Sequence, residues 1–166
     1  MMKYSELKAD LMGMFDEKKL QMLPQEWGFF NEFEREIKTI GYAVNLTEAL
    51  IEKACQKQIE FLVTHHDSWE FIFGLKESCN QILEKNGITH AYFHAPLDDA
   101  EFGTSASLAK ALGMRGLEKV MPYADIYYGG VTGEVEPVDF NVFSETLTHI
   151  LKEQVRCCQN NASPVR

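Results

Sequence analysis

The segment FLVTHHDSW (residues 61–69) decides the fold class and also raises the question of function. Phe61, Leu62 and Val63 form an apolar run that is typical of a buried strand, and this run ends in two adjacent histidines, His65 and His66. The ring nitrogens of buried histidines need hydrogen-bond or metal partners. The segment is therefore either an ordinary polar strand end or the floor of a binding site.

Strand and helix patterns alternate on both sides of this segment. Short connections between such elements favour right-handed βαβ units, and these build a mainly parallel sheet with helices on both faces. We therefore predict one α/β domain of three layers over residues 1–166. The sequence predicts strands over 37–46, 59–65 and 89–95, with helices over 47–57 and 74–87 between them.

The flanking regions give further expectations. Pro24 and Gly28 predict a loop over 24–33. Residues 118–135 predict two short strands that are broken by Pro122 and by the Gly129-Gly130 pair. Amphipathic helices are predicted over 4–16, 104–113 and 137–154, with Thr104 as the cap of the second.

Polar side chains follow two of the predicted strands at their carboxyl ends. His65 and His66 end one strand, His94 ends the next, and Asp98 follows four residues later. The carboxyl ends of neighbouring parallel strands meet at one edge of a sheet, so we expect these side chains to converge there. Neutral imidazoles together with a carboxylate suit a divalent Zn, Fe, Mn, Co or Ni ion.

Ordinary structural roles remain open for the same residues. A histidine at a strand end is commonly just a hydrogen-bonded polar residue. Adjacent strand residues point to opposite faces, so His65 and His66 can share a pocket only where the chain leaves the strand. Asp98 and Asp99 could simply lie near a helix N-terminus, where acidic side chains are stabilised.

Composition narrows the class of protein. The 166 residues include 16 basic and 25 acidic side chains, so the net charge is 16 − 25 = −9. This balance disfavours nonspecific binding to nucleic acid or anionic lipid. No apolar run approaches the roughly 18 to 20 residues that span a bilayer. The four cysteines follow neither a zinc-site spacing nor a disulfide framework, so we expect a cytoplasmic protein with reduced thiols.

The LVTHH strand end, followed by THAYFHAPLDDAEFGTSASLAKALG (89–113), resembles the GTP cyclohydrolase I type 2 homologs, also called the NIF-three-like proteins. Members of that family share a strand that ends in a His-His pair, then an aromatic-x-x-His-x-x-x-Asp segment and a small-residue helix that ends in Leu-Gly. The resemblance implies a fold of two related α/β halves, of which this chain corresponds to the first. It also implies assembly into rings, so we expect a homo-oligomer.

The resemblance further implies a site for two divalent metal ions. His65, His66 and Asp98 match ligand positions of the family, with Asp98 as the bridge between the metals. His94 matches a position that lines the site, where it would orient a ligand or donate a proton in catalysis.

The family's remaining ligands, a histidine and a glutamate four residues apart, belong to the half that the resemblance does not cover. His149 and Glu153 have this spacing, but we expect them on an exposed helix. Two functions follow from the two states of the site. A complete site predicts a metal-dependent hydrolase that acts on a nucleotide or a phosphoester. An incomplete site predicts a non-enzymatic metal-binding or interaction protein.

Overall fold

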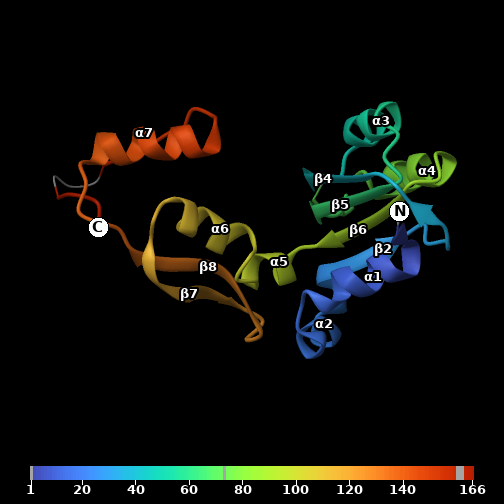
Figure 1. Ribbon diagram of the computed structural model, residues 1–166, viewed down its shortest axis with the longest axis horizontal. Coiled ribbons are helices and arrows are strands. Elements are labelled where there is room, and N and C mark those ends of the chain that lie inside the picture. The colour runs from blue at the N-terminus through green and yellow to red at the C-terminus, as the bar shows by residue number, and fades with distance from the viewer. Residues whose placement is uncertain (1, 73, 160–162) are drawn as a thin grey trace. The chain divides into compact units, whose positions relative to one another are not determined.

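A four-stranded sheet organises the first half of the chain in the computed structural model, which describes residues 2–72, 74–159 and 163–166 (Figure 1). The chain divides into two compact units, Met1–Leu97 and Asp98–Arg166. In the first unit the strands lie in the order β2-β6-β5-β4. Both β4 and β6 run parallel to β5, while β2 runs antiparallel to β6, so the predicted mainly parallel sheet is confirmed. The bounds are Trp27–Phe30 for β2, Ile40–Asn45 for β4, Phe61–His66 for β5 and Thr89–Phe93 for β6.

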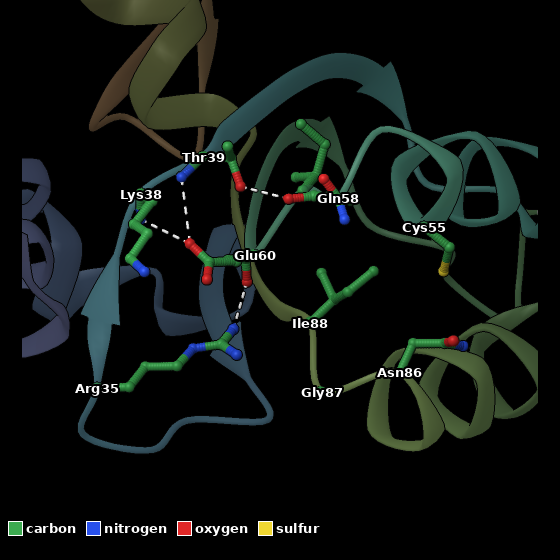
Figure 2. Close-up of a pocket in the computed structure, with 10 residues that line it drawn as sticks. Arg35, Lys38, Thr39, Cys55, Gln58, Glu60, Asn86, Gly87 and Ile88 are labelled. Carbon is green, nitrogen blue, oxygen red and sulfur yellow. Dashed lines mark hydrogen bonds between the residues drawn. The ribbon is translucent and has the colours of Figure 1, made fainter. Parts of the chain in front are cut away.

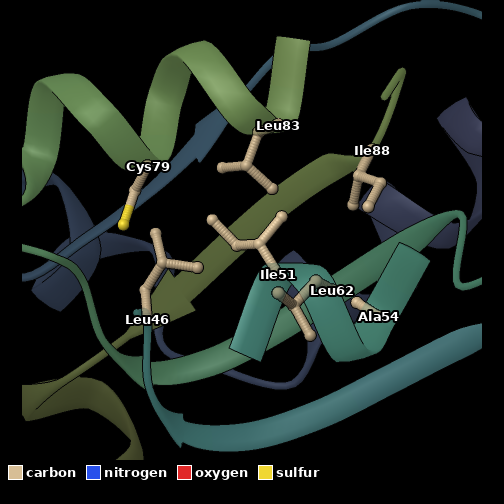
Figure 3. Close-up of a cluster of buried hydrophobic side chains, with 7 residues drawn as sticks. All are labelled: Leu46, Ile51, Ala54, Leu62, Cys79, Leu83 and Ile88. Atoms are coloured by element: carbon tan, nitrogen blue, oxygen red, sulfur yellow. The ribbon is translucent and has the colours of Figure 1, made fainter. Parts of the chain in front are cut away.

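Helices cover both faces of this sheet because side chains alternate along β5. Phe61 packs in an apolar cluster with α1 (Tyr4–Gly13) on one face. The next residue, Leu62, packs on the opposite face with α3 (Glu48–Gln56) and α4 (Lys76–Lys85). Figure 3 shows Leu62 in this second cluster, with side chains from both helices around it. The three layers are therefore helix, sheet and helix, as predicted.

Shorter elements complete the first unit. Thr47 begins α3 as its cap, since its hydroxyl accepts a hydrogen bond from the backbone N–H of Leu50 (3.2 Å). The remaining elements are β1 (Met2–Lys3), which pairs antiparallel with β3 (Glu36–Ile37), the helix α2 (Glu17–Met22) and the 3-10 turn η1 (Pro24–Glu26).

Within the described residues, no helix combines the length and the apolar character that crossing a membrane requires.

The loop predicted over 24–33 is wrong, because Trp27–Phe30 forms the edge strand β2. Gly28 fits a strand here for a local reason. It pairs with Tyr92 on β6, and a Cβ atom at this position would lie only 2.8 Å from the Tyr92 ring. Glycine therefore makes room for the tyrosine ring instead of breaking the strand.

The second unit contains an antiparallel hairpin in place of the two short strands predicted over 118–135. Pro122 and the Gly129-Gly130 pair lie inside its strands, and the turn falls at Ala124 and Asp125, whose φ angles are 50° and 56°. A left-handed backbone conformation at both central turn positions matches the twist of the hairpin strands. Proline is tolerated in β7 because each strand of a two-stranded sheet has an open edge. The strands are β7 (Arg115–Tyr123) and β8 (Tyr127–Glu134).

The described residues on either side of the hairpin also form helices. They are α5 (Ala95–Asp99), which includes the boundary between the units, α6 (Thr104–Ala111) and α7 (Phe140–Leu151). The predicted cap of α6 is wrong, because Gly103 takes the cap position and Thr104 is already helical. The hydroxyl of Thr104 instead donates to Oδ1 of Asp98 (2.5 Å).

His90 lies within β6 and is almost completely buried. The Thr64 hydroxyl donates to the backbone O of His66 (2.7 Å), so it accepts from Nε2–H of His90 at 2.8 Å. Burial lowers the pKa of His90 from 6.5 to about 4. The ring is therefore neutral in the folded protein near neutral pH.

We expect the free energy of unfolding to fall as the pH is lowered from about 6.5 toward about 4, relative to the variant His90→Gln. The unfolded chain binds a proton at His90 in this range and the folded chain does not, so acid favours unfolding by up to about 1.4 kcal/mol per pH unit. Urea unfolding in the presence of a chelator measures both proteins. An identical pH dependence would contradict a buried neutral ring.

A second prediction concerns the apolar layer between α3 and the sheet. Ile51 is fully buried there (Figure 3), and we expect Ile51→Ala to lower the free energy of unfolding by about 2 to 5 kcal/mol because it leaves a cavity. The matched control is Glu52→Ala, since Glu52 is the next residue of the same helix and is exposed. Chemical denaturation should show a lower free energy of unfolding for Ile51→Ala alone. An equal decrease in Glu52→Ala would contradict the assignment of Ile51 to the core.

Candidate metal centre

Three histidines lie together at the carboxyl edge of the sheet. His65 and His66 end β5, and His94 directly follows β6. Because β5 and β6 run parallel and in register, with Thr64 opposite Tyr92, both strands deliver their last residues to the same place. One nitrogen of each histidine lies within 4.8 Å of one nitrogen of each of the others.

The two adjacent histidines converge because the pairing with β6 stops just before them. The last pair between the strands is Thr64 with Tyr92. Beyond it the Thr64 hydroxyl donates to the carbonyl of His66 (2.7 Å), and His66 still pairs with Asn45 of β4. The rings of His65 and His66 then lie 4.4 Å apart between centroids. The two rings therefore approach one another, although neighbouring side chains of a regular strand point to opposite faces.

Each imidazole is held through its Nδ1 atom by an oxygen acceptor. His65 Nδ1 lies 3.1 Å from the backbone O of Phe93. His66 Nδ1 lies 2.6 Å from Oδ1 of Asn45 at the end of β4, and His94 Nδ1 lies 2.6 Å from Oε2 of Glu26. The carbonyl and amide oxygens, and the carboxylate in its ionised form, accept hydrogen bonds and cannot donate them, so Nδ1 carries the hydrogen in all three rings.

In a neutral imidazole whose hydrogen is on Nδ1, Nε2 is the nitrogen that can bind a metal ion. A hydrogen bond from Nδ1–H to a carbonyl or carboxylate is the usual support of a metal-binding histidine, because it fixes the ring orientation and increases the basicity of Nε2. The donor set of His65, His66 and His94 therefore fits a divalent transition metal.

Two buried acids flank the histidines. Glu26 is 6% exposed and also binds His94 through its backbone, since its carbonyl accepts from the His94 N–H at 2.8 Å. Asp67 directly follows the histidine pair and is 3% exposed. It accepts from the backbone N–H of Ser68 (2.8 Å) and lies 3.2 Å from Nζ of Lys76. Both buried carboxylates therefore have partners within the protein, and that of Glu26 contacts a histidine of the cluster.

The sequence interpretation missed the supporting residues Asn45 and Glu26. Asn45 carries the same signal as the histidines, since it is a polar residue at the carboxyl end of a parallel strand. Glu26 gives no such signal, because it reaches His94 through the antiparallel strand β2, which had been predicted as a loop.

The other candidates from the sequence lie in the second unit. Asp98 begins that unit and accepts a hydrogen bond from Thr104, and its role as a bridging ligand stays a prediction. His149 is exposed on α7, as expected, whereas Glu153 is exposed but lies just beyond the end of this helix.

The opposite edge of the sheet contains a pocket whose polar groups bind one another (Figure 2). The Glu60 carboxylate accepts from the backbone N–H groups of Lys38 (2.6 Å) and Thr39 (3.2 Å), and the first of these bonds is the main factor that lowers its pKa. The Arg35 guanidinium donates to the backbone O of Glu60 (2.5 Å). These contacts connect the segment before β4 to the start of β5 and serve the fold.

Comparisons with known proteins agree with this architecture. The model of the family Duf34/NIF3 (NGG1p interacting factor 3) matches residues 9–166. The GTP cyclohydrolase 1 type 2 homolog of Pasteurella multocida (strain Pm70) is 28% identical over 139 residues, which are 79% of this chain and 54% of that protein. The chain therefore spans about half the length of this curated relative.

Solved structures show the same fold at low sequence identity. TTHA1606 from Thermus thermophilus has a TM-score of 0.77 and 24% identity, and the match covers 99% of this chain and 69% of that one. Reduced HcgD from Methanocaldococcus jannaschii has a TM-score of 0.71 and 22% identity, with 89% and 60% covered. At this level of identity the structures support the fold alone.

We expect Glu26→Gln to weaken metal binding about 10- to 100-fold, because the amide lacks the charge that strengthens the His94 ligand. Isothermal titration with Zn²⁺ measures the change. Glu84→Gln is the matched control, since Glu84 is exposed on α4 and the substitution is the same. Equal affinities of Glu26→Gln and the control would show that Glu26 does not support the site.

Proposed function

Since the chain belongs to the Duf34/NIF3 family, we propose that it binds a divalent metal ion through His65, His66 and His94 and uses it for hydrolysis. The observation that carries this proposal is the convergence of the three imidazoles. Every Nδ1 has an oxygen acceptor, and the three rings offer nitrogens within 4.8 Å of one another.

The number of protein ligands favours a catalytic ion over a purely structural one. Structural zinc sites are usually closed by four protein ligands, whereas catalytic sites have three and keep one position open for water or substrate. Three imidazoles suit Zn, Fe, Co or Ni better than Mg or Ca, which prefer oxygen ligands. A bound divalent ion of this kind lowers the pKa of a water ligand toward about 7 and so supplies a nucleophile at neutral pH.

The chain's own residues would have distinct tasks in such a reaction. Glu26 and Asn45 fix the rings of His94 and His66 before any ligand binds. The family resemblance implied that His94 orients a ligand or donates a proton. We propose instead that its Nε2 is the third metal ligand, because His94 offers a nitrogen close to those of His65 and His66. Asp98 is proposed as a further carboxylate ligand that would allow a second ion to bind.

The proposed substrate is a small molecule with a hydrolysable centre, either a phosphoester or a nucleotide whose ring is opened. The Pasteurella relative is named after GTP cyclohydrolase, and this chain spans 54% of its length. A second half, or a second copy of the chain in a homo-oligomer, would supply further ligands in this proposal. Binding of the metal without hydrolysis is the rival function.

The test compares His66→Ala with His149→Ala. We expect the first variant to lose the metal, because it removes one of the three donors, and the second to retain it, since His149 lies exposed on α7. Elemental analysis of the untagged proteins measures the metal content, and Asp98→Ala should lower it only if a second ion is bound. Equal retention in both histidine variants would contradict the site. If the wild type retains the metal but cleaves neither p-nitrophenyl phosphate nor GTP, the result would favour metal binding without hydrolysis.

A further inference from the structure

An indole ring borders the three histidines. The Trp69 ring lies 5.1 Å from that of His94 and 5.9 Å from that of His66 between centroids. It meets His94 nearly edge to face, with an angle of 71° between the planes. A ligand that touches this indole would therefore lie next to the proposed metal ligands.

A tyrosine of β6 packs against the indole. The Trp69 and Tyr92 rings meet edge to face, with centroids 5.9 Å apart and 87° between the planes, and the Tyr92 hydroxyl donates to the backbone O of Gln25 (3.3 Å). Burial raises the pKa of Tyr92 to about 12, so its hydroxyl keeps its proton at neutral pH. Gly28 leaves the space for the Tyr92 ring on the neighbouring strand. The Tyr92 ring that Trp69 packs against is therefore positioned by the sheet.

Phe71 stacks on Trp69 although it is largely surrounded by solvent. Their centroids lie 5.8 Å apart with 26° between the planes, and Phe71 is 82% exposed. A phenylalanine so exposed gains little from burial. The two side chains, which we call the aromatic platform, present ring surface beside a polar site, and such a combination is typical of sites that bind planar ligands.

We propose that the aromatic platform of Trp69 and Phe71 binds a planar heteroaromatic ring of the substrate and thereby places its reactive group at the three histidines. This inference rests on the proposed function and narrows it to substrates with such a ring, as in nucleotides. Phosphoesters without a ring would lack the contact. Stacking tolerates different bases, so the platform selects for a ring and not for one base.

Paired ligands that differ only in the ring test this proposal on the zinc-loaded protein. Adenosine 5′-monophosphate carries the ring, and ribose 5-phosphate keeps the sugar and the phosphate without it. We expect the nucleotide to bind more tightly, and Trp69→Ala to weaken its binding by about tenfold or more. Binding of ribose 5-phosphate should not change, and Trp69→Phe should restore most of the affinity. Phe33→Ala is the control, because Phe33 is an exposed aromatic residue that contacts Arg35.

Fluorescence gives a direct readout of stacking. In the variant Trp27→Phe, Trp69 is the one remaining tryptophan of the chain, and the nucleotide should quench it while ribose 5-phosphate should not. Equal affinity of the wild type for both ligands would overturn the platform and leave the metal site intact. Failure to retain zinc would overturn the proposed function instead. Ring-dependent binding without any hydrolysis would support the platform and contradict the hydrolase.

Discussion

The parallel pairing of β5 with β6 is the constraint on which the rest of the site depends. Only in this arrangement do the residues that follow both strands reach the same edge of the sheet. An antiparallel pair would place His94 at the opposite end from His65 and His66. The apolar layers on the two faces of the sheet fix the register, because a shift by one residue would exchange Phe61 with Leu62 and turn each toward the wrong layer.

The pairing brings the histidines together, and the surrounding oxygens orient them. Each oxygen acceptor comes from a different neighbouring segment: the carbonyl of Phe93 from β6, the amide of Asn45 from β4 and the carboxylate of Glu26 from η1. Buried imidazoles without such partners would carry a desolvation cost. Because these partners exist in the protein itself, the ring orientations do not depend on a ligand, and a metal ion would meet donors that are already arranged.

The sequence predicted the parts of the fold that follow from periodic patterns. The apolar run before His65, the helices on either side of it and the parallel sheet were all readable, since they depend on local alternation and short connections. The strand around Gly28 was not readable, because its glycine serves the Tyr92 ring of a distant strand. The strand break predicted at Pro122 was wrong for a similar reason. A strand accommodates proline where its edge of the sheet is open, and this depends on how the two strands of the hairpin pair. The three histidines were found from the sequence, whereas Glu26 depends on that unpredicted strand and was missed.

The X-ray absorption spectrum of the zinc-loaded protein tests the central claim most directly. Three histidines bound through Nε2 should give imidazole nitrogens at about 2.0–2.1 Å from the metal, together with the outer scattering of the rings. The spectrum of His94→Ala should lose one of these imidazoles, because His94 is the third donor of the cluster. Scattering from sulfur at about 2.3 Å, as cysteine ligands would give, or a spectrum without imidazole would contradict a metal centre at this edge of the sheet.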